Sequence, residues 1–236
     1  MANRAKYLLA EGLLIVISIL IAFAIDAWWA ERQDRTEERR ILESLKAEFQ
    51  ANAETIPEFI DEHQRSARYT TALARTMNKA GPGGSFGINT ADLAQVIQHR
   101  STDPQRGALD AILQSGELRY ISNPKIRQRL AGWPRLVVDA TENETLLRTQ
   151  WGPMLFEASA KNADLSPFQD MDLACWGDPT LEQCQTSQVT LNWNTEIIGY
   201  LNPVSGYTNE AARELGLLVE EANNIVALID QELTTL

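Results

Sequence analysis

The sequence has few residues of the kinds that build catalytic or metal centres. It contains two cysteines and two histidines in 236 residues. These are too few for a Cys₄ zinc site, and a Cys₂His₂ site would need all four residues to converge. Basic residues are also in deficit, with 21 Lys and Arg against 32 Asp and Glu and a formal net charge of −11. Phosphates attract Lys/Arg surfaces, so this balance argues against a nucleic-acid partner. The hydrophobic content of 44% excludes wholesale disorder.

What the sequence does have is one long apolar run, LLAEGLLIVISILIAFAIDAWW, from Leu8 to Trp29. About 20 apolar residues in a helix cross the hydrocarbon layer of a bilayer, and Trp and Tyr favour its two interfaces. The run predicts a short cytoplasmic tail at residues 1–6, a transmembrane helix at 7–29 and an extracytoplasmic domain at 30–236. The rival interpretation is a cleaved signal peptide, with Arg4 and Lys6 as its basic region and Ala22-Phe23-Ala24 as its cleavage site.

The polar and small residues of this run fall on one stripe of the expected helix. Glu11, Ser18 and Ala22 point in nearly one direction, with Asp26 about 60° away. Small and polar stripes let membrane helices approach closely and form hydrogen bonds with each other. We therefore expect Glu11, Ser18, Ala22 and Asp26 to form a transmembrane interface with other membrane subunits or a second copy. The alternative is that Glu11 and Asp26 extend to the two headgroup layers.

Two signals conflict over the orientation. Basic residues are more numerous after the apolar run than before it, which by itself would place the large domain in the cytoplasm. Cys175 and Cys184, spaced Cys-x₈-Cys, instead suggest a disulfide in an oxidising compartment, although two reduced thiols are the alternative. A short basic tail is also a common cytoplasmic start. We expect a bacterial inner membrane protein with its N-terminus in the cytoplasm and its main domain in the periplasm.

Helical periodicity dominates the rest of the chain. We expect an all-α fold, in which the membrane helix continues into a bundle of about four main helices with an irregular acidic loop at 164–207. Thr55 and Pro57 predict a second helix start, Pro134 predicts a kink or a split, and Thr208 predicts the cap of the last helix. The expected elements are helices at 31–53, from 57 to a flexible glycine-rich loop at 81–87, at 90–100, at 104–115 closed by Gly116, from 124 capped by Asn123, and at 209–233, with one strand at 188–193.

Two stretches carry a resemblance to a known family. One is the N-terminal pattern of Lys6-Tyr7, Glu11, the apolar run, Trp28 and Glu31-Arg32; the other runs from Leu113 through Ser115-Gly116 and Ile121-Ser122-Asn123-Pro124 to Arg127. Together they resemble a family of uncharacterised bacterial single-pass membrane proteins, defined as a domain of unknown function. The resemblance implies a transmembrane anchor with a helical extracytoplasmic domain, and no activity or catalytic residues.

No catalytic motif accompanies the two histidines. His63 and His99 are expected at the surface or partly buried, and the scattered tryptophans are expected to fill the core. We predict no catalytic residues, no cofactor and no metal site. The sequence favours a membrane-anchored accessory or structural subunit that packs through its transmembrane helix and offers a docking surface. The alternative is an extracytoplasmic ligand-binding or sensing module that signals through a partner.

Overall fold

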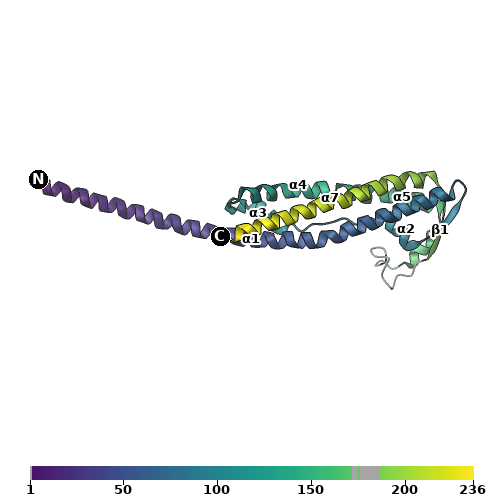
Figure 1. The fold of residues 1–236 in the computed structure, drawn as a ribbon, viewed down its shortest axis with the longest axis horizontal. Helices are drawn as coiled ribbons and strands as arrows, with labels where there is room; N and C mark the ends of the chain where they lie inside the picture. The colour runs from purple at the N-terminus through teal and green to yellow at the C-terminus, as the bar shows by residue number, and fades with distance from the viewer. Residues whose placement is uncertain (1, 172–174, 176–186) are drawn as a thin grey trace.

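One helix, α1 (Ala2–Ala80), extends along the whole molecule. In the computed structural model, which describes residues 2–171, 175 and 187–236, its N-terminal part projects alone and its second half enters a bundle (Figure 1). The last helix, α7 (Thr195–Leu233), returns along α1 and ends near the point where α1 enters the bundle. The fold is all-α with one small sheet, and a long N-terminal helix leads into the other helices, as the sequence predicts.

Three long helical runs form the bundle. α4 (Pro124–Leu146) continues through a π-helical turn, Leu147–Trp151, into α5 (Gly152–Asn162). Lys46 of α1 pairs with Asp230 of α7 at 2.6 Å, and Thr71 meets Ser205 at 3.3 Å between hydroxyl oxygens. The residue numbers rise on one helix as they fall on the other, so α1 and α7 are antiparallel. α4 is likewise antiparallel to α7, since Arg129 pairs with Glu221 and Asn143 donates to Glu214.

Two predicted helix starts, at Pro57 and at Thr208, are wrong, and of the two outcomes predicted for Pro134 the split does not occur. Pro57 and Pro134 lie inside α1 and α4, so neither residue starts or splits a helix. Thr55 donates its hydroxyl to the Ala51 carbonyl within α1. Thr208 is fully buried inside α7 and donates to Val204, while the true cap of α7 is Asn194, whose side chain accepts from the amides of Glu196 and Ile197. The irregular acidic loop is correspondingly shorter than expected.

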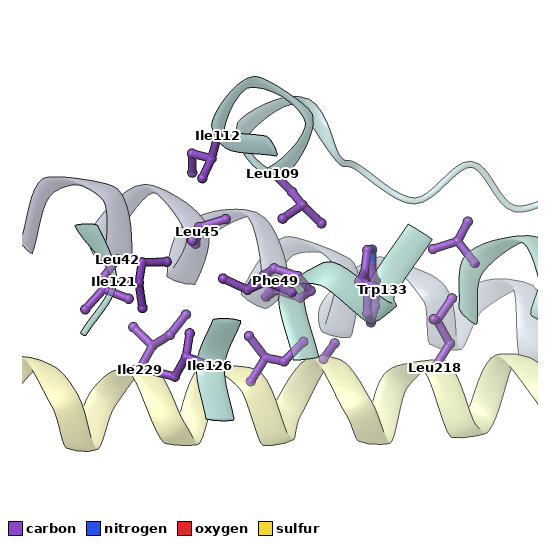
Figure 2. Close-up of a cluster of buried hydrophobic side chains, with 14 of the residues drawn as sticks. Leu42, Leu45, Phe49, Leu109, Ile112, Ile121, Ile126, Trp133, Leu218 and Ile229 are labelled. Atoms are coloured by element: carbon purple, nitrogen blue, oxygen red, sulfur yellow. The ribbon is translucent and has the colours of Figure 1, made fainter. Parts of the chain in front are cut away.

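The bundle contains two large hydrophobic cores, one near the point where α1 enters and one at the far end. The first joins α1, α4 and α7 with the short helix α3 (Gly107–Ser115). Trp133 is fully buried in this core (Figure 2), with the Phe49 ring at 4.7 Å in an edge-to-face contact. The second core lies between residues 69–77 of α1, the π-helical turn with α5, and the start of α7. The expectation that tryptophans fill the core holds for Trp133.

A two-stranded antiparallel sheet closes the far end. β1 (Ser85–Asn89) pairs with β2 (Gln188–Asn192), with Phe86 opposite Leu191. β2 matches the predicted strand, whereas β1 falls partly in the segment expected to be a flexible loop. The turn before β1 contains Gly81 and Gly83, both with positive φ, which only glycine adopts easily.

The segment between the sheet and α4 is held against α1 by side-chain hydrogen bonds to its backbone. It contains α2 (Thr90–Ile97), α3 and the 3₁₀ turn η1 (Glu117–Tyr120). Glu48 accepts from the amides of Ala108 and Leu109 at the start of α3, where a helix N-terminus favours a carboxylate. Asn52 both donates to and accepts from the Gln105 backbone at 2.7 Å. α1 therefore fixes this connection as well as the core.

Candidate functional site: the exposed end of the first helix and the base of the bundle

The apolar segment of α1, residues 11–29, is exposed along its whole length. It is long and apolar enough to cross a membrane, with a mean hydropathy of 2.3 over its best 18-residue window and none of that window buried. Phe23 is 68% exposed and Leu14 66% exposed. A water-soluble monomer rarely exposes an apolar surface of this size. One long apolar N-terminal helix thus fits a single membrane span.

The four predicted interface residues lie on the exposed surface of this segment. Glu11, Ser18, Ala22 and Asp26 are all exposed, and no other described element of the chain packs against them. Ser18 donates its hydroxyl to the Leu14 carbonyl at 2.8 Å, which satisfies its polar group within the helix. Among the side chains described from residue 11 onward, no basic group forms an ion pair with Glu11 or Asp26. The four residues of the stripe are therefore exposed, and their role as an interface stays a prediction.

The base of the bundle is organised around Ser122, Asn123 and Pro124. The Asn123 side chain accepts from the Lys125 amide and so caps α4, as predicted. Its amide nitrogen donates to Glu232 of α7 at 2.7 Å, while the Ser122 amide donates to Glu38 of α1 at 2.5 Å. This motif therefore ties all three long helices together just beyond the apolar segment. Gly116 closes α3 in the left-handed conformation, with φ of 75°.

A buried polar layer, formed by His63, Ser66, Thr102 and Glu144, lies between the two cores. Glu144 is 0% exposed and accepts three hydrogen bonds, from His63 Nε2 at 2.7 Å, the Thr102 amide at 2.9 Å and the Thr102 hydroxyl at 2.8 Å. Ser66 donates to the Gln95 carbonyl at 2.7 Å. A buried carboxylate needs such partners to offset its desolvation. The expectation that His63 is at the surface or only partly buried is wrong, because it is 3% exposed.

His99 lies close to this layer, and neither of its ring nitrogens has a hydrogen-bond partner in the part of the chain that the structure describes. Its ring lies beside the π-helical turn, close to Gly152. The Cδ2 atom is 3.5 Å from the position that a Cβ at Gly152 would occupy. Burial, together with the nearby His63, lowers the pKa of His99 to about 4, so its ring is neutral at pH 7. The Val96 backbone acts in the opposite direction and raises the pKa, but it is the smallest of the three effects.

Neither histidine belongs to a metal-binding group of the described residues. In residues 2–171, 175 and 187–236, no group of three or more His, Cys, Asp or Glu side chains is arranged to hold a metal ion. The carboxylate beside His63 accepts hydrogen bonds at both of its oxygens, so the polar layer is a structural network. The sequence showed no sign of it because its members are far apart along the chain.

Of the two cysteines of the predicted disulfide, Cys175 belongs to the described residues and Cys184 does not. Cys175 is 1% exposed and packs with Ala94 and Met171 in a small cluster at the far end of the bundle. Cys184 lies outside the described residues, as does Trp176, so the Cys175–Cys184 bond stays a prediction. The acidic residues Asp172, Asp178 and Glu182 lie outside them too.

Comparisons with known proteins add no relative. No protein-family model, no curated protein and no solved structure matches the chain. The resemblance to a family of bacterial single-pass membrane proteins therefore depends only on the residues quoted for it above.

Proposed function

We propose that the protein is a single-pass, membrane-anchored accessory subunit, in which α1 is both the transmembrane helix and the central helix of the extramembrane bundle. The observation that carries this proposal is the continuity of α1 from Ala2 to Ala80, with an apolar half that no described element covers. No loop separates the two halves, so a tilt or rotation of the membrane segment is transmitted to the bundle.

The accessory role is supported by the stripe of Glu11, Ser18, Ala22 and Asp26. A carboxylate facing lipid is costly, whereas one facing a neighbouring helix accepts a hydrogen bond or pairs with a basic group. Ser18 and Ala22, one turn apart, leave space for that neighbour. The partner is a second copy or another membrane subunit. The ligand-binding alternative has no comparable observation in its favour in the part of the chain that the structure describes.

The proposed location is a bacterial inner membrane, with the bundle in the periplasm. The support is the short basic N-terminal tail and the two cysteines. Alkylation of intact cells with a membrane-impermeant maleimide, with and without reductant, tests it. We expect labelling only after reduction. Two thiols that react without reductant in lysates unfolded with urea, which exposes the buried Cys175, and do not react in intact cells would place the bundle in the cytoplasm.

The association is tested with bulky residues on the stripe. Ser18→Leu and Ala22→Leu keep the segment apolar but fill the space for a neighbouring helix, so we expect the assembly seen on native gels in mild detergent to be lost. Ile19→Leu, on another face, is the matched control. Carbonate extraction should leave every variant in the membrane. An unchanged assembly for both stripe variants would contradict the interface, and an N-terminus cleaved after Ala24 would contradict the anchor.

A further inference from the structure

Three arginines follow the apolar segment on one face of α1. Arg32, Arg35 and Arg39 are spaced by three, four and seven residues, which places them on the same side of a helix. They line a surface groove of about 360 Å³ together with Trp28, Glu31, Thr36 and Leu236. Trp28 belongs to the apolar segment, so the groove begins at its end and extends toward the bundle.

Most acidic residues between positions 31 and 40 lie outside this groove. Glu38 is buried and accepts from the Ser122 amide, and Glu37 accepts from Arg40. Asp34 and Glu37 line a separate groove, on the side of α1 that faces η1. The ten residues from 31 to 40 have no net charge, but three of their four arginines lie on one face, and the fourth, Arg40, pairs with Glu37.

Two of these arginines keep their charge available. Glu31 pairs with Arg35 at 2.5 Å and so neutralises the middle member. The Arg32 guanidinium lies over the Trp28 ring, 5.8 Å from its centroid, which holds it beside the apolar segment without neutralising it. Arg39 is exposed and forms no ion pair in the part of the chain that the structure describes. The groove therefore presents two free guanidinium groups, on Arg32 and Arg39, seven residues apart.

Their depth suits the headgroup layer. Trp28 and Trp29 favour the boundary between hydrocarbon and headgroups. At about 1.5 Å per residue, Arg32 lies about 6 Å beyond Trp28 and Arg39 about 16 Å beyond it along the helix. Side chains on a helix lean toward its N-terminus, so the Arg39 guanidinium reaches back toward the membrane. Both groups can then approach a phosphate at the surface of the bilayer.

We propose that this groove is a binding site for the phosphate of an anionic phospholipid headgroup. The proposal rests on the proposed membrane-spanning function. Guanidinium groups form paired, charge-assisted hydrogen bonds with phosphate, and the Trp28 ring contacts the glycerol and upper acyl region of the lipid. The bound lipid fixes the height of the base of the bundle above the membrane. This follows because Arg32 and Arg39 belong to the same helix as Glu38, which accepts a hydrogen bond from the Ser122 amide at the base.

The chain supplies a matched control groove. Arg68 and Arg75 have the same seven-residue spacing on α1, are exposed, and line a surface groove of about 410 Å³ with Gln64, Thr71 and Asn209. This second groove is far from the apolar segment. The double variants R32Q/R39Q and R68Q/R75Q therefore change the net charge of the protein equally, on the same helix, at two different heights.

The experiment is native mass spectrometry of the full chain in mild detergent, titrated with phosphatidylglycerol or with phosphatidylcholine. We expect the parent chain to bind the first phosphatidylglycerol more tightly than phosphatidylcholine. R32Q/R39Q should weaken phosphatidylglycerol binding about 30-fold, or about fivefold for each arginine. R68Q/R75Q should leave it unchanged, and 0.5 M salt should weaken it in the parent.

Two results would overturn the site. One is equal binding of the two lipids by the parent chain, and the other is an equal loss in both double variants, which would reflect net charge alone. Flotation of the parent chain with vesicles separates this failure from failure of the proposed function. A chain that floats without a lipid preference contradicts only the headgroup site, whereas a chain that does not float contradicts membrane anchoring itself.

Discussion

The two halves of α1 belong to one continuous helix but differ in the solvent exposure of their apolar side chains. In residues 11–29 the large apolar side chains are exposed on every face, from 44% at Ile17 to 68% at Phe23. In residues 41–56 they occupy one face and are fully buried, as Leu42, Leu45 and Phe49 are at 0% exposure. The second half is stabilised by α4 and α7, whereas the first half has no such partner within the described chain.

This difference shows where the stabilising energy must come from. Burial of a Leu, Ile or Phe side chain contributes about 1.5–3 kcal/mol. In the bundle half that energy comes from folding of the chain itself. In the exposed half this burial energy can come only from lipid or from another helix. The apolar segment therefore needs a membrane or a partner helix to cover it. Substitutions in the two halves should therefore differ in their effect on the stability of the bundle.

The largest contrast is between the same substitution in the two halves. Phe49→Ala removes a ring that packs against Trp133 and leaves a cavity, so the free energy of unfolding of the bundle should fall by about 3–5 kcal/mol. Phe23→Ala should change it by less than about 0.5 kcal/mol, because that ring touches no part of the bundle. Urea unfolding in mild detergent, followed by tryptophan fluorescence, measures both. Similar losses for the two variants would contradict the division of α1.

Polar groups should show a similar contrast on α4. Glu144→Ala removes the buried carboxylate that holds His63 and Thr102, so it should cost about 3 kcal/mol or more of unfolding free energy. Glu142→Ala, two residues away and exposed, is the control and should have an effect within about 0.5 kcal/mol. If the two variants unfold at the same urea concentration, the polar layer does not stabilise the bundle.

The bundle half should also respond to acid through His99. Its pKa is lowered to about 4 in the folded protein, against about 6.5 when unfolded, so only the unfolded chain takes up the proton between these values. The stabilisation is complete above pH 6.5 and is lost as the pH falls toward 4, by up to about 3 kcal/mol. Unfolding measured from pH 7 to pH 4 should show a shallower decline in His99→Leu. Parallel curves for parent and variant would exclude this contribution.

The smallest effect concerns the motif at the base. Asn123→Ala removes the cap of α4 and the bond to Glu232, and should cost about 1–2 kcal/mol of unfolding free energy. The exposed Asn224→Ala on α7 serves as the reference. If Asn123→Ala is as stable as this reference, the motif is not what joins α4 to α7.

Local sequence signals predicted the features that local chemistry determines. The apolar run, the Asn123 cap before Pro124 and the Gly116 helix end each depend on a few neighbouring residues, and all three are present. The same reasoning wrongly predicted helix starts at Pro57 and Thr208, and Pro134 does not split α4. A proline inside a helix costs about 3 kcal/mol locally, but packing of α1 against α7 along much of their length outweighs it.

Long-range pairing explains the rest of what was missed. β1 is a strand because β2, about a hundred residues later, pairs with it, and its own Ser-Phe-Gly-Ile-Asn sequence has little strand character. The His63–Glu144 pair joins residues 81 positions apart. No spacing rule connects such residues, so they become visible only when α1 and α4 are placed side by side.

Nitroxide scanning along α1 tests the central claim most directly. Single spin labels from residue 13 to residue 56 in the full chain, reconstituted in phospholipid vesicles, report collisions with oxygen in lipid and with a nickel chelate in water. If α1 is one continuous helix in the membrane, labels at 13–25 should collide often with oxygen, and labels on the stripe should collide less often. At 41–56 access to both reagents should fall every 3.6 residues, with the same helical phase as in the residues around 30. Nickel access throughout 13–25, or a break in phase between 29 and 41, would contradict it.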